Sequence, residues 1–490
     1  MLKALPATRW DYSAAGHLLN RAGFGGCPAE IEELANLGPE KAVSRLVDYE
    51  TIEDSTPNPE WAKPDPSRQQ KFMEMRQADE QERRRLQREL QQTERQRILE
   101  LRAWWLRRMA HGPRPLQEKM VLFWHGHFAT SVEKVKEAYL MWRQNDLFRR
   151  LASGNWRELL IEAAKDPAML VWLDQAQSKK EHPNENFARE VMELFALGEG
   201  HYTEKDIAEG ARALTGWSYD RPRQEFIERP FWHDRGSKTI FGKTGNFDGE
   251  GFLELIVQQP QAPRFITAKI WRFFAGSEPD EKVAEGLARI FRENGSQFRP
   301  VLRAMFLSEE FYSSSIVRNQ VKSPVQWLVG SVKMLERELP PPMICFGLTR
   351  NLGQELFAPP NVKGWDGGLS WITTNNLLSR YNEAATLVQG DTSMMGGLFP
   401  NNPNANREIE RRLRFVREGS VEPEKLFSAE IRSDKQKLIV ALENRLLQTR
   451  LKPKQENVLR DYLDSKSELG DQDILNAIRL VMSTPEYQLA

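Results

Sequence analysis

The centre of this chain is organised by one stretch, Asn184-Glu185-Asn186-Phe187-Ala188-Arg189-Glu190-Val191-Met192-Glu193-Leu194-Phe195. Its apolar residues recur at helical spacing, which predicts an amphipathic helix. At roughly 100° per residue, Asn186, Glu190 and Glu193 share a second face. Carboxylates buried on that face would need a cation, a proton or arginines to balance their charge. We expect this helix to be buried on both faces, with a polar site on the second.

Composition narrows the function classes. The 490 residues include 69 basic and 69 acidic side chains, so no net charge draws the chain to nucleic acid. The two cysteines, Cys27 and Cys345, are too far apart in sequence to indicate a disulfide framework or a cysteine zinc site. Neither a secretory signal nor a run of ~20 apolar residues is present, so we expect no membrane span and a cytoplasmic location.

Helical patterns dominate the rest of the sequence. They predict a mainly α protein: a multi-helical globular body with a small β-hairpin insertion and a long charged helical arm. The arm is expected to project, because Glu, Arg and Gln dominate from Arg68 to Leu99 and leave few apolar residues to bury. The predicted parts are an N-terminal helical hairpin and linker (1–67), the arm (68–112), a central helical core (113–389) with its β insertion (218–250), a loop (390–406) and a C-terminal helical tail packed on the core (407–490).

Five of the seven histidines lie in blocks rich in aromatic residues or glycine, and three of these are candidate metal ligands: His125, His127 and His201. Together with Glu190 and Glu193 they would offer nitrogen and oxygen ligands suited to zinc, iron or manganese. No HExxH motif is present, so this hypothesis requires at least three of the five side chains to converge. The alternative is structural: each histidine bonds to a separate buried partner, and the polar residues around Asn186 and Arg189 form a network between loops.

Several blocks of the sequence together resemble the bacterial domain-of-unknown-function 1800 family. They span nearly the whole chain in order: His17 to Gly25, Trp124 to Ser131, Pro183 to Phe195, Gly200 to Thr203, Ala213 to Trp217, Pro359 to Trp365 and Pro485 to Ala490. The resemblance implies no assigned activity. Family members often carry export signals and are commonly encoded beside sulfatase-like exported proteins of the domain-of-unknown-function 1501 family. The resemblance thus implies such a partner, and an envelope location if this chain is exported with it.

Four of these segments are expected to build one central site: Gly16 to Gly26, Trp124 to Ser131, Asn184 to His201 and Pro359 to Trp365. Two function classes remain open. In the first, the chain is a metal-assisted enzyme: Asn186 and Arg189 orient the substrate, and five side chains bind the metal or move protons, namely His125, His127, Glu190, Glu193 and His201. In the second, the chain is a non-catalytic partner or maturation factor whose charged arm docks another protein.

Overall fold

The computed structural model describes residues 2–389 and 421–490 and confirms a mainly α-helical protein. Its N-terminal region holds the predicted helical hairpin and one further helix. Asp11 caps the first of them by accepting a hydrogen bond from Ala14 N, and prolines begin the other two, where a missing N–H costs nothing. The three are α1 (Tyr12–Ala22), α2 (Pro28–Leu37) and α3 (Pro39–Val47).

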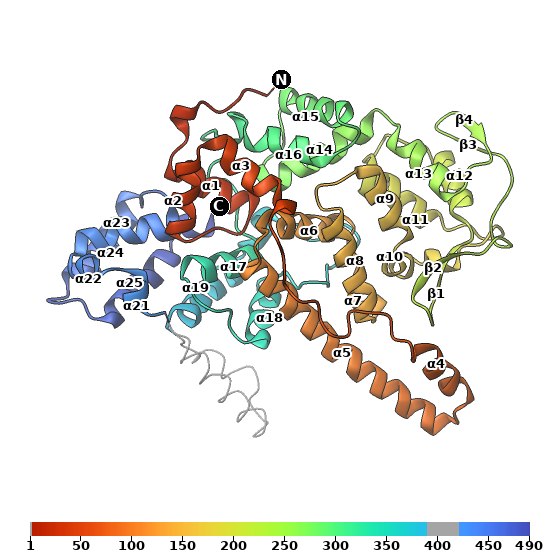
Figure 1. Cartoon of the computed structure of the whole chain (residues 1–490), viewed down its shortest axis with the longest axis horizontal. Coiled ribbons are helices and arrows are strands. Elements are labelled where there is room, and N and C mark those ends of the chain that lie inside the picture. Colours follow the sequence, from red (N-terminus) through yellow and green to blue (C-terminus); the bar gives the residue numbers. More distant parts are fainter. Residues whose placement is uncertain (1, 390–420) are drawn as a thin grey trace.

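The charged arm is a helical hairpin rather than one continuous helix. α4 (Arg68–Gln77) stops at Ala78, and Asp79 then caps α5 (Glu80–His111) by accepting a hydrogen bond from Glu82 N. Figure 1 shows α5 projecting from the body, with α4 folded back beside its outer end. The inner end of α5 is buried, because its late apolar stripe enters the core at Leu101, Trp104 and Trp105.

The central body packs helices around a cluster of aromatic rings. Trp124, Phe128 and Trp156 stack on one another, all almost fully buried. A cluster of this kind supplies much of the apolar burial that holds the surrounding helices in place. The helices are α6 (Pro115–His127), α7 (Val132–Val135), α8 (Ala138–Arg150), α9 (Trp156–Lys165), α10 (Pro167–Trp172), α11 (Glu185–Glu190), η4 (Val191–Ala196) and α12 (Glu204–Leu214).

The predicted β insertion consists of two small hairpins. β1 (Trp217–Asp220) pairs antiparallel with β2 (Glu225–Glu228), Trp217 facing Glu228, and β3 (Lys238–Ile240) pairs antiparallel with β4 (Lys243–Gly245). Both lie at the outer edge of the molecule (Figure 1). The helices that follow return the chain to the body: α13 (Gly249–Val257), α14 (Gln261–Ala275), α15 (Glu281–Glu293), α16 (Phe298–Phe306), α17 (Pro324–Met334), α18 (Pro342–Asn351) and α19 (Thr374–Gln389).

The C-terminal helices are bound to the body by buried polar contacts. Tyr487 hydrogen-bonds Ser331 across 2.6 Å, and Arg445 donates to Met334 O at 2.9 Å. The predicted loop at 390–406 and the first residues of the predicted tail lie outside the described residues. The described elements are α21 (Pro423–Leu426), α22 (Ala429–Ser433), α23 (Lys435–Leu442), η8 (Glu443–Leu447), α24 (Pro453–Asp464) and α25 (Asp471–Met482).

Candidate functional site

The helix predicted at 184–195 changes type halfway. Asn184 caps α11 by accepting a hydrogen bond from Phe187 N, and after Glu190 the chain widens into the π-helical turn η4, where Leu197 N donates to Met192 O at 2.7 Å. π turns are rare and occur often at functional sites. The wider turn also alters the angular spacing beyond Val191, so the α-helical count used above does not hold for Glu193.

The polar face of this helix is only partly buried, so the expectation of burial on both faces is wrong. Glu190 and Glu193 are half-buried, whereas Asn186 is exposed. Arg189 does not face a site either, because its guanidinium forms an ion pair with Glu204, with N–O distances of 2.9 and 2.7 Å. The two carboxylates remain as the polar feature of the turn.

The two carboxylates influence each other. Burial, followed by repulsion from Glu193, raises the pKa of Glu190, while Lys363 and Arg189 act in the opposite direction. Glu193 accepts a hydrogen bond from Tyr202 Oη at 2.7 Å. Burial and this bond raise the pKa of Tyr202 and keep it a donor. Glu193 can therefore accept a further hydrogen bond. Glu190, beside it, ionises less readily than an ordinary glutamate.

The end of the π turn is capped by side chains from two other helices. His127 on α6 hydrogen-bonds Phe195 O through Nε2 at 3.0 Å, and Lys269 on α14 donates to Leu194 O at 3.0 Å. These carbonyls lie in the last turn, where intrahelical donors run out. Burial lowers the pKa of Lys269 to about 8. Burial, and then Lys269, lowers the pKa of His127 well below its usual value.

The neutral His127 ring is left with one unused nitrogen. Because Nε2 meets a carbonyl oxygen, Nε2 carries the proton and Nδ1 is an acceptor. Nδ1 is buried and has no hydrogen-bond partner among the described residues. His125 Nδ1 is buried without a partner in the same way, so this open acceptor is not specific to the surroundings of the π turn.

The loop at 359–365 docks against the end of α6 through two glycines. Gly364 has φ +88°, and a Cβ there would lie 2.2 Å from Gly126 O. Only glycine allows this approach at position 364, which is the physical reason for the Gly in the motif Val362-Lys-Gly-Trp365; a Cβ at Gly126 would meet only Trp365, at 3.9 Å. Val362 and Lys363 are thereby held beside the π turn.

These elements enclose a groove of about 610 Å³, which we call the π-turn groove. Its walls come from α6, η4, α14, α15 and the loop at 359–365. Arg264 and Arg272 in the lining are already paired, with Glu281 and Glu278. The remaining polar lining is of mixed charge and includes His127, Glu193, Glu199, Lys269 and Lys363.

The metal hypothesis is not supported by the geometry. In the described ranges no three His, Cys, Asp or Glu side chains come together in a group that could hold a metal ion. His125 and His127 are two residues apart on a helix and therefore leave it on different sides. His201 is exposed on the loop after η4. The prediction that three of the five ligand candidates converge is wrong.

His125 belongs instead to a buried polar network. Its Nε2 lies 3.0 Å from Asn145 Nδ2, and Arg149 donates to Asn145 Oδ1 at 2.7 Å, which orients the amide. Arg149 and Arg108 also donate to Glu118, each at 2.8 Å. Burial opposes ionisation of Glu118, but the two arginines outweigh it and lower its pKa. Burial lowers the pKa of His125 to about 3, so this ring is a neutral part of the core.

Three of the four segments expected to form the central site do meet at the π-turn groove. The fourth, Gly16 to Gly26, does not line it. Arg21 is fully buried and donates to Phe274 O, Ile316 O and Ala490 O, all at 2.8 to 3.0 Å. This segment therefore joins α1 to the C-terminal part of the chain.

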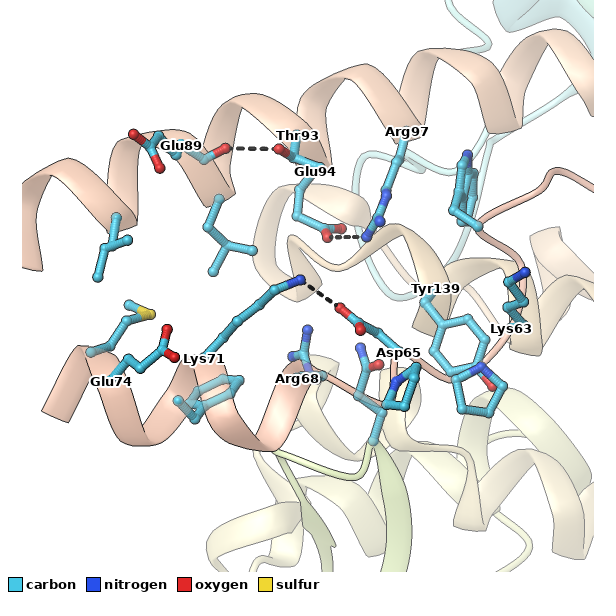
Figure 2. Close-up of a pocket in the computed structure, with 18 residues that line it drawn as sticks. Lys63, Asp65, Arg68, Lys71, Glu74, Glu89, Thr93, Glu94, Arg97 and Tyr139 are labelled. Carbon is cyan, nitrogen blue, oxygen red and sulfur yellow. Dashed lines mark hydrogen bonds and ion pairs between the residues drawn. The ribbon is translucent and has the colours of Figure 1, made fainter.

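A second hollow of about 580 Å³ lies within the arm, and we call it the arm hollow. Phe72 and Met75 on α4 and Leu86 and Leu90 on α5 contribute its apolar lining. Figure 2 shows Lys71 of α4 reaching Asp65, and Glu94 of α5 paired with Arg97. The arm therefore encloses a hollow with an apolar lining, and the charged sequence of the arm did not predict this hollow.

The base of the arm is fixed by buried ion pairs and hydrogen bonds. Arg68 donates to Glu137 at 2.6 Å, and Gln224 donates to the same carboxylate at 2.7 Å. Glu94 accepts a hydrogen bond from Ala138 N at 2.7 Å. These contacts tie the arm to α8 and to the first β hairpin.

Sequence reasoning missed several residues of the groove. Tyr202 and Lys363 lie inside the blocks Gly200 to Thr203 and Pro359 to Trp365. Those blocks did not predict that Tyr202 donates to Glu193 or that Lys363 lines the groove. Lys269 and Phe265 lie on α14, whose sequence reads as an ordinary amphipathic helix. Nothing local in the chain predicts that Lys269 meets a carbonyl 75 residues away.

The chain matches the family described as Protein of unknown function (DUF1800) over residues 17–489. It therefore belongs to this family, as the motifs indicated. No curated protein and no solved structure matches it. In the described ranges, no helix has the length and apolar character needed to cross a membrane.

Proposed function

We propose that this chain binds a small polar ligand in the π-turn groove, where Glu193 and Lys269 can exchange protons with it. One observation supports the proposal above others. Three segments remote in sequence, around His127, Glu193 and Lys363, meet at a groove. Polar side chains in its lining can still form hydrogen bonds to a ligand. Glu193, Lys269 and Lys363 all line the groove, and each of these side chains can still accept or donate a hydrogen bond there.

The polar lining suggests the ligand class. Lys269 uses one N–H on Leu194 O and keeps two for an anionic group, with Lys363 nearby on the loop. Glu193 holds one bond from Tyr202 and can accept another from a hydroxyl or ammonium group. The groove therefore suits a small molecule that has both an anionic group and a hydrogen-bond donor, such as a hydroxy acid or an amino acid.

The chemistry available is acid–base chemistry. With its pKa lowered to about 8, Lys269 gives up a proton near neutral pH far more readily than an ordinary lysine. The carboxylate of Glu193 is within the same groove and can accept one. This assigns to Glu193 a role in proton transfer and to Glu190 an electrostatic one, while Asn186 and Arg189 have no part in binding.

A thermal-shift screen tests the proposal. Glycerate, serine and gluconate should raise the unfolding temperature of the wild-type chain, because a ligand that binds only the native state stabilises it. Lys269→Gln should abolish the shift. Lys63→Gln, which removes a lysine from the arm hollow, is the matched control and should retain it. A shift that survives Lys269→Gln, or no shift with any of the three probes, would contradict the proposal.

A second candidate function is the docking of a protein partner on the arm, and the arm hollow favours it. An amphipathic helix placed between α4 and α5 would cover Phe72, Met75, Leu86 and Leu90 and complete a three-helix arrangement. A sulfatase-like protein of the domain-of-unknown-function 1501 family is the partner that the family resemblance implies. Co-purification that is lost with Leu86→Asp and Leu90→Asp, but retained with Glu80→Ala, which is on the same helix but does not line the hollow, would support docking there.

A further inference from the structure

The loop between β2 and β3 presents an unusually exposed aromatic side chain. Phe231 is 89% exposed, the highest value among the large apolar side chains of the described residues. The two hairpins that flank the loop lie at the outer edge of the molecule (Figure 1), and neither Phe231 nor any other residue of this loop lines the π-turn groove or the arm hollow. A single exposed apolar side chain is common on protein surfaces, so the residues around Phe231 decide whether it marks an interaction site.

The exposure of Phe231 is not caused by a loose loop. Arg229 N donates to Gly216 O and Trp232 N donates to Arg229 O, at 2.8 and 2.9 Å. His233 Nδ1 meets Thr215 O at 2.8 Å, and Asp234 N donates to Thr215 Oγ1 at 2.8 Å. The backbone on both sides of Phe231 is therefore fixed, and the ring is held at the apex.

Basic side chains surround this apex. Lys179 Nζ lies 4.4 Å from the centroid of the Trp232 ring, and the Arg229 guanidinium carbon lies 4.7 Å from it. Lys180 N donates to Trp232 O at 2.7 Å, which brings a further exposed lysine to the loop. Arg235 is also exposed. Together with Phe231 these residues form what we call the basic aromatic patch.

Acidic residues nearby only partly offset this charge. Asp234 is engaged by Arg212 in two bonds of 2.7 and 3.2 Å. Glu181 lies 3.9 Å from Lys180, and Glu228 is exposed on β2. The whole chain has no net charge, so an excess of cations at one edge is a local property.

We propose that the basic aromatic patch binds the surface of an anionic membrane, with Phe231 inserted among the lipid headgroups. An exposed aromatic ring flanked by Lys and Arg provides the two contributions on which interfacial binding depends: apolar burial and attraction to anionic lipid. Nucleic acid is the less suitable occupant. Both cations near Trp232 lie over its ring, so that ring is not free to stack on a base.

Vesicle co-sedimentation with the full chain tests the proposal. Vesicles of phosphatidylcholine with about a third phosphatidylglycerol should bind the protein, and pure phosphatidylcholine vesicles should bind it several-fold less. Phe231→Ser should weaken binding about tenfold, which is the size expected when one phenyl group no longer leaves water. Lys179→Glu combined with Lys180→Glu should weaken it similarly, and 0.5 M salt should remove most of it.

The control is Leu369→Ser, which removes an apolar side chain that is 83% exposed but lies outside the patch. This variant should bind as the wild type does. Because Phe231 makes little contact with the core, its variant should fold normally, which circular dichroism can check. Equal binding by Phe231→Ser and wild type, equal losses in the two serine variants, or binding to single-stranded DNA without binding to vesicles would overturn the proposal.

Discussion

The π-turn groove and the arm hollow are almost equal in volume, at about 610 and 580 Å³, but their walls are held in different ways. In the groove, buried contacts fix the walls: His127 and Lys269 cap the π turn, and Gly364 lies against Gly126. In the arm hollow, α4 and α5 are joined at the outer turn, where Arg83 donates to Met75 O and Ala78 O, and are anchored to the body at the base. The comparison suggests that the groove is preorganised for a small ligand, whereas the hollow can adjust to a larger partner.

The largest effect is expected where the groove wall is tightest. Gly364→Ala should lower the free energy of unfolding by more than about 3 kcal/mol, because the new Cβ would meet Gly126 O at 2.2 Å and φ is +88°. Gly368→Ala is the matched control, since φ there is +58° but nothing lies within 4 Å. It should cost about 1 kcal/mol from backbone strain alone. If urea unfolding gave the two variants equal losses in the free energy of unfolding, the close approach of Gly364 to Gly126 O would not be important.

The second prediction separates the base of the arm from its outer part. Glu94→Ala should cost about 2 kcal/mol, because it leaves Ala138 N buried without its acceptor. Glu89→Ala, on the same helix, removes only an exposed contact with Arg85 at 3.5 Å and should change stability by less than about 0.5 kcal/mol. If urea unfolding gave Glu94→Ala and Glu89→Ala similar changes in the free energy of unfolding, the buried hydrogen bond from Ala138 N to Glu94 would not stabilise the base of the arm.

The third prediction uses pH to test the groove wall. The pKa of His127 is lowered by burial, so the native ring stays neutral while the unfolded chain takes up a proton below pH 6.5. The unfolded state then binds more protons, and stability falls as pH falls, by up to about 1.4 kcal/mol per pH unit from this residue. His127→Gln should reduce the slope of stability against pH by that amount between about pH 6 and 5. An unchanged slope would mean that His127 is protonated in the native state.

The smallest effect is expected at the outer part of the arm. Lys71→Met removes a partly exposed ion pair with Asp65 at 3.0 Å and should change stability by less than about 1 kcal/mol. Amide hydrogen exchange of residues 72–78 should nevertheless be faster than that of 191–197 in the wild type, because few core contacts hold α4. Slower exchange in α4 than in the π turn would contradict the contrast between the two hollows.

Much of the fold could be predicted from sequence. The spacing of apolar residues and the charged run that begins at Arg68 predicted the mainly α-helical body, the small β insertion at 218–250 and the projecting arm. Those signals are local, so a single sequence contains them. The break at Asp79 was missed because aspartate in a run of helix formers is tolerated inside a helix as well as at its start.

The site was harder to predict than the fold. The motifs around Trp124, Glu190 and Gly364 supply three segments that line the π-turn groove, and the absence of a side chain at Gly364 explains how two of them can meet. The π turn was not predicted, and the side chains that cap its carbonyls, His127 and Lys269, come from helices remote in sequence. The metal hypothesis failed for a related reason: residue type suggested ligands, but only tertiary structure shows that His125 and His127 leave α6 toward different partners.

Crystals of the protein soaked with glycerate would test the central claim most directly, because they locate a ligand without assuming where it binds. We predict electron density in the π-turn groove, with the carboxylate of glycerate within hydrogen-bond distance of Lys269 Nζ and a hydroxyl group near Glu193. Crystals of Lys269→Gln soaked in parallel should lack that density. Glycerate bound only in the arm hollow, or bound equally in both crystals, would contradict the claim that the π turn and its caps form a small-ligand site.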